Sequence, residues 1–285
     1  MGIIKAFGTA VSSAAADQWK ECFYCGSMEG GLLQTRGVRM ESARSVNRGS
    51  SDVITDGSLI IVADGQCAIA TESGAITGVY DRPGENIFSS KRSAGIFSKG
   101  GVGSLIGDIM SRAQFGGDIV PVTQRLYYIN TLEIPGSPFE VNAPIPFRFR
   151  DPNTGLDMDG GVFCAGMYSY RIADPELFFK NLSGNANAYY SSSVTPQMDS
   201  ELLSALQWAL ALLSEKGMRP SQLIGCTQEL CDSLNLALKE SWSGQRGLAI
   251  ASLALSSVDV VDINTMQLLQ QSAALRPSHM GATED

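Results

Sequence analysis

The chain has almost no histidine. His279 is the only one among the 285 residues, and it lies in a polar segment near the C-terminal end. A Ser-His-Asp triad or a Cys-His pair needs a histidine that is held by packing and oriented by a second group. Metal sites built on histidine need two or three of them. The sequence therefore argues against these enzyme classes and indicates no cofactor, whereas chemistry based on carboxylate, Lys or Ser side chains stays open.

Long hydrophobic runs and excess positive charge are also missing. The longest run of Val, Ile and Leu alone covers residues 59–62, whereas a helix that crosses a membrane needs about 20 mainly apolar residues. The 21 Lys and Arg residues are outnumbered by 29 Asp and Glu residues, which gives a net charge of -8. Proteins that bind nucleic acid through its phosphates have the opposite balance, so nucleic acid is not an expected partner.

Cysteine is present but scattered. No apolar secretory leader precedes the 6 cysteines, a pattern that favours a reducing cytoplasm. Cys22 and Cys25 have the spacing of a redox pair or of half a zinc site, but no second pair of this kind follows. An isolated pair is a weak signal. Structural thiols are the favoured interpretation, and metal or redox chemistry is the alternative.

The first 19 residues carry apolar side chains at helical spacing, with Ser, Thr and Asp on the other face. This pattern predicts an amphipathic helix. Two roles stay open: binding to a membrane surface, or docking on the body of the protein or on a neighbour. The residues expected to contact a membrane are Ile3, Ile4, Phe7, Val11 and Trp19.

The first strong strand signal comes after a polar stretch. Residues 36–56 are rich in Ser, Gly and Arg and are predicted to be a loop. Residues 59–63 and 67–71 then flank the dipeptide Asp64-Gly65, which is typical of a two-residue hairpin turn. Residues 75–80 complete a predicted meander of three strands.

The middle of the chain predicts a change of subdomain. Strands are expected at residues 124–130 and 147–150, and the turn residues at 151–155 mark a boundary. A second β-rich stretch runs over residues 156–172. Asp174 as N-cap and Pro175 at the first helical position then predict a short helix over 175–182.

Two carboxylates at the start of that second stretch are a candidate metal site. Asp157 and Asp159 have the spacing of residues that share one face of a strand, as metal ligands could. Carboxylates in this position are more often solvated edge residues, which discourage pairing between sheets. The second interpretation is favoured.

A strong helix is predicted from Asp199, ending at Gly217 as a C-cap. Its apolar stripe is wider than a helix with one solvent face needs, which predicts a second covered side and a surface for self-association. A second helix is expected at 227–242, followed at 248–261 by a strand with bulges or by two short strands. A further helical pattern occupies 266–276. The predicted self-association residues are Leu203, Trp208, Leu212, Met266 and Leu269.

These elements predict an α+β fold with two β-rich subdomains, the second with helices packed on a sheet. An N-terminal amphipathic helix and a short C-terminal helix complete the expected architecture. The expected divisions are residues 1–35 for the N-terminal segment, 36–150 and 151–263 for the two subdomains, and 264–285 for the short helix and tail.

Several segments, in this order, resemble the SPFH domain of stomatins, prohibitins and flotillins. They are the run 59–69 with Gly74 and Pro83-Gly84, the run 168–179 around Asp174-Pro175, and residues 247–260. Other segments resemble a YdjI-like bacterial branch of that family labelled virion core protein. They are Met1 to Lys5, Asp17 to Glu21, Gln124 to Asn130 and Ser200 to Gln207.

The resemblance implies a non-enzymatic scaffold that associates with itself at the cytoplasmic inner face of the cell membrane. Such a protein organises membrane patches or recruits membrane-stress proteins. The implied partners are further copies of the chain, the membrane surface and small membrane or membrane-stress proteins. The alternative is a soluble oligomeric adaptor or shell that reaches membranes only through a partner, with the glycine-dense residues 94–117 as one of its binding surfaces.

Overall fold

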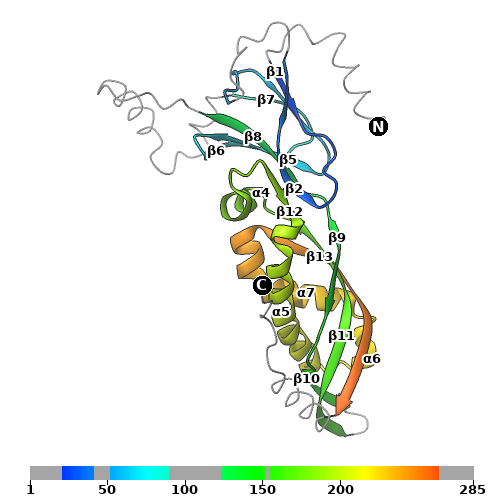
Figure 1. Ribbon diagram of the computed structural model, residues 1–285. Helices are drawn as coiled ribbons and strands as arrows, with labels where there is room; N and C mark the ends of the chain where they lie inside the picture. Colours follow the sequence, from blue (N-terminus) through cyan, green and yellow to red (C-terminus); the bar gives the residue numbers. More distant parts are fainter. Residues whose placement is uncertain (1–20, 42–51, 90–122, 152–154, 263–285) are drawn as a thin grey trace, which may run out of the picture. The chain divides into compact units, whose positions relative to one another are not determined.

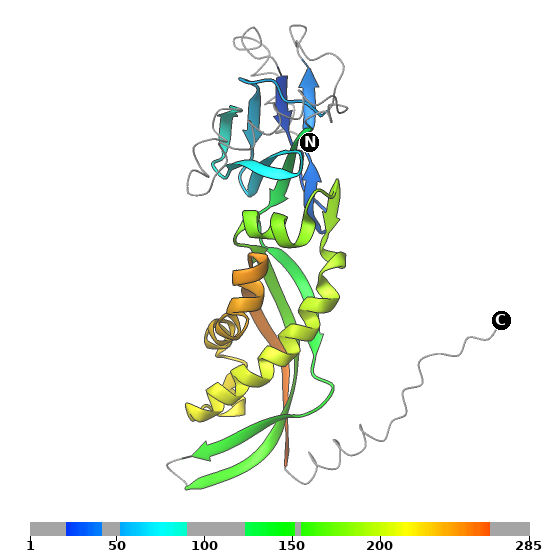
Figure 2. The same ribbon diagram turned by 90° about the vertical axis from the view of Figure 1, so that its left-hand side faces the viewer.

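The computed structural model describes residues 21–41, 52–89, 123–151 and 155–262 (Figures 1 and 2). The chain divides into two compact units, each with its own core. The first unit, here called the sandwich unit, consists of Met1–Leu132 and Pro175–Ser191. The second, the helix-covered unit, consists of Glu133–Asp174 and Ser192–Asp285. The predicted N-terminal helix, the loop 94–117 and the predicted C-terminal helix lie outside the described residues.

Two sheets form the sandwich unit. Sheet A has the strand order β3-β1-β4-β7, and sheet B has the order β12-β2-β8-β5-β6. The strands of sheet A are β1 (Glu21–Tyr24), β3 (Val38–Glu41), β4 (Leu59–Val62) and β7 (Gly84–Ile87). Those of sheet B are β2 (Leu32–Arg36), β5 (Gln66–Glu72), β6 (Ala75–Tyr80), β8 (Gln124–Asn130) and β12 (Ala188–Tyr190).

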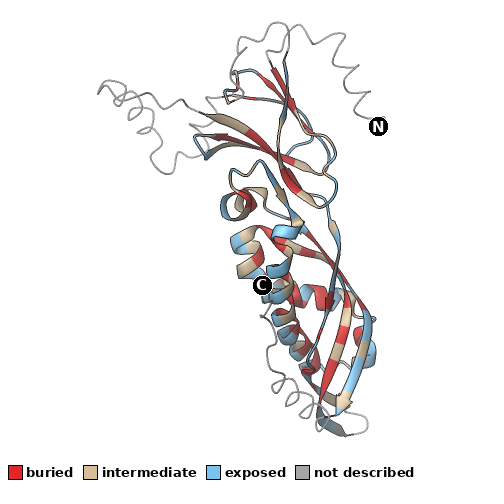
Figure 3. Cartoon of the chain, in the orientation of Figure 1, coloured by how far each residue is buried: buried red, intermediate tan, exposed pale blue. Residues whose placement is uncertain are grey.

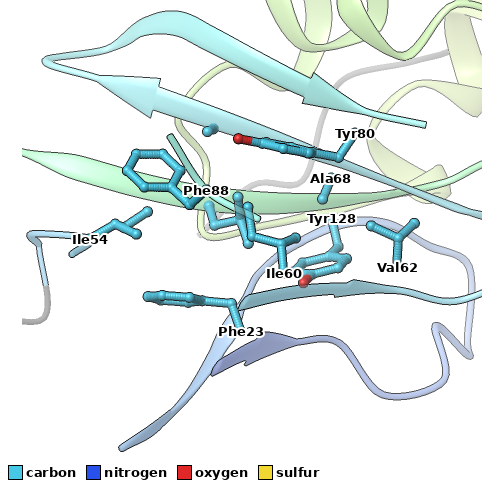
Figure 4. Packing of buried hydrophobic residues seen from close by; sticks show 10 residues of the cluster. Phe23, Ile54, Ile60, Val62, Ala68, Tyr80, Phe88 and Tyr128 are labelled. Carbon is cyan, nitrogen blue, oxygen red and sulfur yellow. The ribbon is translucent and has the colours of Figure 1, made fainter. Parts of the chain in front are cut away.

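The core of the sandwich unit lies between these sheets (Figure 4). Phe23 and Ile60 come from sheet A, and Ala68 and Tyr128 come from sheet B. The Tyr128 hydroxyl reaches across and donates a hydrogen bond to the carbonyl of Ile61 at 2.9 Å. Its polar end is therefore satisfied inside an otherwise apolar core.

The other face of sheet B is also buried. The short helix α4 (Pro175–Phe178) and the π-helical turn η2 (Phe179–Ser183) belong to the same unit, and the Phe179 ring packs on Tyr127 with 5.3 Å between ring centroids. Together α4 and η2 confirm the helix predicted over 175–182.

Strands precede residue 59, so the prediction of a loop over 36–56 is wrong for its first residues. Arg36 ends β2, and β3 pairs antiparallel with β1. Val38 and Met40 alternate with charged residues, and such a short edge strand is stabilised by pairing rather than by its own composition. Arg39 lies 3.6 Å from the buried carboxylate of Glu21, which balances its charge.

The predicted hairpin of residues 59–63 with 67–71 is also wrong. Both strands exist, but β4 pairs with β1 and β7, whereas β5 pairs with β6 and β8. The Asp64-Gly65 turn forms, with φ of 77° at Gly65, and connects the two sheets of the sandwich. The hairpin lies one strand later, where Ser73 and Gly74 turn β5 into β6 with φ of 48° and 87°.

Sheet C forms the helix-covered unit. Its central strand β11 (Leu156–Ile172) pairs along one side with β13 (Leu248–Asp262) and along the other with β10 (Ile145–Asp151) and β9 (Ile134–Glu140). The β-rich stretch predicted over 156–172 forms one continuous strand. The register with β11 skips Ala251 and Ser256 of β13. Of the two predicted alternatives, one strand with bulges or two short strands, the structure shows the strand with bulges.

Helices cover one face of sheet C (Figures 1 and 2). They are α5 (Thr195–Glu215), α6 (Pro220–Leu223), α7 (Thr227–Ala237) and the π-helical turn η4 (Lys239–Gly244), and the short 3-10 turn η3 (Ser191–Ser193) precedes them. Helix α5 begins four residues before the predicted Asp199, with Pro196 in its first turn. Gly217 ends it as predicted, with φ of 77°.

The division between the units differs from the predicted boundary at residue 150. It falls after Leu132, and the later segment Pro175–Ser191 returns to the first unit. The reason is strand pairing: β9 and β10 both pair with β11 and so belong to its sheet. The turn residues after Asp151 connect two strands of one sheet instead of two subdomains.

Candidate contact surfaces

The two cysteines of the CxxC pair are poorly placed for metal binding or redox chemistry. Cys22 lies in β1, and Cys25 packs against the sandwich core. Burial raises the pKa of both thiols from 9.0 to about 11, and a thiolate is needed to ligate or attack. Among the described residues, no group of three or more His, Cys, Asp or Glu side chains could hold a metal ion. The geometry favours structural thiols.

The carboxylates at the start of β11 have an ionic partner. Arg148 of β10 donates two hydrogen bonds to Asp157, at 2.7 and 2.8 Å. The pair is exposed on the sheet edge, where water screens the charges and such contacts add little to stability. Both oxygens of Asp157 are engaged, which favours the edge-residue interpretation over a metal site.

Helix α5 carries three of the predicted self-association residues, and the structure places them on two flanks. Trp208 and Leu212 are four residues apart and lie on one side of the helix, the side of Glu201. Leu203 precedes Trp208 by five residues, which at about 100° per residue turns it about 140° away. The three residues therefore form two separate surfaces.

The flanks differ in exposure from the rest of α5. The side toward sheet C is buried and includes Leu202, Leu206 and Leu210. Leu203 and Leu212 are half-buried, whereas the Trp208 side chain is 45% exposed. A wide, rigid indole in water is typical of the anchor residues of protein interfaces.

Polar contacts hold the Trp208 flank to the core of its unit. Glu201 accepts two hydrogen bonds from Arg246, at 2.6 and 2.9 Å, and one from the indole N–H of Trp242 at 2.9 Å. The Arg246 hydrogen bonds hold the pKa of Glu201 below its usual 4.5. Trp242 is buried against Tyr168, with 6.4 Å between ring centroids. The flank is thus part of a rigid surface, which lowers the entropic cost of binding a partner.

A second apolar surface lies on the outer face of sheet A. Phe23 and Ile60 point into the core, so their neighbours along each strand point outward. The pairing register aligns four outward side chains across the four strands. We call this set the sheet A row: Met40, Cys22, Leu59 and Ile87.

The sheet A row is buried at its centre and exposed at its ends. Cys22 and Leu59 are 7% and 1% exposed, whereas Met40 and Ile87 are 45% and 62% exposed. Beside it, Val38 pairs with Tyr24 and Ile61 pairs with Glu85, and these side chains also alternate with the residues that face the core. Exposed apolar side chains gathered on one sheet face mark a surface that accepts another layer.

Sequence reasoning missed the sheet A row because half of it lies in the stretch predicted as a loop. The signal was short: Val38 and Met40 alternate with two charged residues. Only the pairing of β3 with β1 and of β1 with β4, which joins distant segments, shows that these residues share a face with Leu59.

The remaining predicted contact residues lie outside the described part of the chain. These are Ile3, Ile4, Phe7, Val11 and Trp19 near the N-terminus, and Met266 and Leu269 near the C-terminus. Their membrane and self-association roles stay predictions. Within the described residues, no helix combines the length and the hydrophobicity that crossing a bilayer requires.

Comparison with known proteins places the chain in a family. Residues 47–276 match the SPFH domain-Band 7 family, and the mixed architecture of sheets and helices is consistent with its fold. No curated protein matches the chain. Members of this family are generally membrane-associated scaffolds without enzymatic activity. The match takes in most of the chain, which therefore belongs to the SPFH domain-Band 7 family.

Proposed function

We propose that the chain is a self-associating peripheral scaffold on the inner face of the cell membrane, of the YdjI-like bacterial branch labelled virion core protein. It organises membrane patches or recruits membrane-stress proteins, and it carries no catalytic site. Family membership supports the general class of membrane-associated scaffold. The finer assignment rests on the resemblance of the segments around Met1, Asp17, Gln124 and Ser200.

The observation that carries self-association is the exposed Trp208 on a rigid helix. Its neighbour Leu212 on the same flank is also only partly covered. Covering an interfacial tryptophan contributes about 2 kcal/mol or more when it acts as an anchor. A second copy of the chain offers the same flank, so a pair related by two-fold symmetry would bring two such residues together.

The membrane contact is assigned to the N-terminal segment. Its apolar stripe of Ile3, Ile4, Phe7, Val11 and Trp19 leads directly into β1, which starts at Glu21. An amphipathic helix in this position would lie in the interface plane, with its apolar face in the acyl boundary. The segment has only two basic residues, Lys5 and Lys20, so apolar burial would supply most of the binding energy.

The net charge favours one alternative, a soluble oligomeric adaptor or shell that reaches the membrane through a partner. A charge of -8 opposes adsorption on a leaflet rich in anionic lipid, because like charges repel. Only basic residues gain energy near such a surface, about 1 kcal/mol each. This alternative keeps self-association and gives up direct lipid contact. Vesicle binding separates the two functions.

Sedimentation velocity of the full chain tests self-association. We expect species heavier than the 30.3 kDa monomer at micromolar concentration. Trp208→Ser with Leu212→Ser should weaken association about tenfold or more. Gln207→Ala, an exposed substitution on the same helix, is the matched control and should change nothing. A wild-type chain that sediments as a monomer would overturn both the scaffold and the adaptor.

Flotation with vesicles of neutral and of anionic lipid tests membrane contact. The wild-type chain should float, and Ile3→Asp with Phe7→Asp should abolish flotation, because a charge in the apolar face opposes burial. Ser12→Asp, on the polar side of the segment, is the control. If the wild-type chain oligomerises but never floats, the soluble adaptor is the correct function.

A further inference from the structure

The outer face of sheet A carries the sheet A row, whose two end residues are exposed. Its inner face packs in the sandwich core, and sheet B lies beyond that core. Met40 and Ile87, at the ends of the row, are exposed to a degree unusual for large apolar strand residues. A sheet with one face on the core and a second apolar face normally has another layer on that second face.

The N-terminal segment is joined in sequence to β1, the strand that carries Cys22 at the centre of the row. Residues 1–20 lead into Glu21, the neighbour of Cys22 in the row. Trp19 precedes Cys22 by three residues, a reach of about 10 Å even when fully extended. The apolar stripe of this segment is therefore tethered beside the row and meets it at a high effective concentration.

The dimensions of the two surfaces match. As a helix, Ile3 to Trp19 would be about 24 Å long at 1.5 Å per residue. The sheet A row crosses four strands, or three spacings of about 4.8 Å, which is roughly 14 Å between the outer strands. A helix laid across the row would cover Met40 and Ile87 together with the centre. A short isolated helix is marginal in water, so its apolar face needs such a support.

We propose that residues 1–20 dock on the outer face of sheet A of the same chain, and that this docking competes with membrane binding. The inference rests on the proposed membrane role of the segment. Each apolar side chain of the stripe can face either the sheet or the lipid. When the segment is docked, the sheet A row covers its apolar face and keeps it from the lipid. The apparent membrane affinity therefore falls by the fraction of chains in which the segment is docked.

Labelling of Cys22 tests the docking directly, because this thiol is at the centre of the row. N-ethylmaleimide is added to the full chain and to a variant lacking residues 1–20, and each cysteine is followed by peptide mass spectrometry. Cys22 should react about tenfold faster in the truncated chain, since its protection depends on a local opening. Cys67, buried in sheet B of the same unit, is the internal control and should keep its rate.

A full-length variant guards against misfolding of the truncated chain. Phe7→Asp keeps all residues but weakens the apolar stripe, and it should also raise the labelling rate of Cys22. If neither change alters the reactivity of Cys22, the docking proposal is wrong. Protection that grows with protein concentration would assign the row to a second copy, which also overturns it.

Flotation separates docking from direct lipid contact by the sign of its effect. Met40→Asp with Ile87→Asp should release the segment and raise the vesicle-bound fraction severalfold. Val79→Asp, an exposed strand residue of sheet B, is the matched control. A fall in binding would mean that the row itself touches lipid, and no change would mean that the row is independent of the segment; either result overturns the proposal.

A different set of results is expected if the proposed membrane role is wrong. If no version of the chain binds vesicles, the membrane role is wrong. Docking still stands in that case when removal of residues 1–20 exposes Cys22. The labelling experiment therefore judges the docking, and wild-type flotation judges the membrane role.

Discussion

Sheet B of the sandwich unit and sheet C of the helix-covered unit differ in the number of faces that they bury. In sheet B, Ala68 and Tyr128 face the sandwich core, while Ile69 and Tyr127 are buried on the opposite face. In sheet C, the side covered by helices is buried and includes Tyr168, whereas the other side is open (Figure 3).

The burial patterns along single strands show the same difference. In β5, five consecutive residues from Cys67 to Thr71 are buried, so both faces are closed. In β11, buried residues alternate with Phe163 and Ala165, which are partly exposed, and with Met167, which is 51% exposed. A continuous apolar strand indicates two covering layers, and an alternating strand indicates one. Contact surfaces must therefore lie elsewhere than on the central strands β5 and β8 of sheet B.

The largest effect is expected for Trp242→Ala. Trp242 is fully buried, and its indole N–H donates to Glu201. Truncation leaves a cavity and removes one of the hydrogen bonds that Glu201 accepts, which should destabilise the helix-covered unit by about 3–5 kcal/mol. Hydrogen exchange in increasing urea should show lost protection in α5, α7 and β13, with β5 and β8 retained. Equal loss in both units would show that they unfold as one and would break the comparison. Trp208→Ala is the exposed control.

Truncation on the second face of each sheet sharpens the comparison. Ile69→Ala removes a fully buried side chain from sheet B and should cost about 2–5 kcal/mol of the free energy of unfolding. Met167→Ala acts on the open face of sheet C and should stay within about 0.5 kcal/mol. Urea denaturation at low protein concentration measures the free energy of unfolding of both variants. A large cost for Met167→Ala would reveal an additional layer on sheet C.

Acid should weaken the helix-covered unit partly through Glu201. The folded pKa of Glu201 lies below its ordinary 4.5 because Arg246 donates to it. Its stabilising contribution is therefore complete above about pH 5.5 and is lost as the pH falls through the depressed folded value. Glu201→Gln should cost about 1–2 kcal/mol at pH 7 and should flatten the pH dependence of unfolding between pH 5 and 3. An unchanged slope would contradict the assigned role of the ion pair.

Local signals in the sequence were sufficient for elements that depend on their own residues. The length of β11, the bulges at Ala251 and Ser256 and the helix start at Asp174-Pro175 all follow from periodicity, turn residues and capping. The wide stripe of α5 also pointed to Trp208 as a contact residue. The exposure of Trp208 could be seen only in the structure, because packing decides which flank of a helix stays in water.

Pairing between distant segments could not be predicted in this way. Asp64-Gly65 has the chemistry of a hairpin turn, but β4 instead pairs in parallel with β1, which begins 38 residues earlier at Glu21. A turn motif fixes the local backbone, whereas the partner of each strand depends on which faces must be buried. The sheet A row was missed for the same reason, since it exists only when Met40, Cys22 and Leu59 become neighbours.

A modest effect is expected for Gly217, a residue that the sequence identified correctly as the end of helix α5. Gly217 has φ of 77°, and Met218 N–H donates to the carbonyl of Leu213 at 3.2 Å, as in a Schellman cap. Gly217→Ala places a Cβ in a left-handed conformation, and because this position has open space around it, the cost should be only that of the backbone, about 1 kcal/mol. Gly247→Ala is the contrast within the same unit, since its Cβ would lie 2.2 Å from the carbonyl oxygen of Asp174. Urea denaturation should therefore show a much larger loss in the free energy of unfolding for Gly247→Ala than for Gly217→Ala. Equal losses would mean that the backbone conformation alone, and not the packing of the helix-covered unit, determines how much a side chain at these turns destabilises the protein.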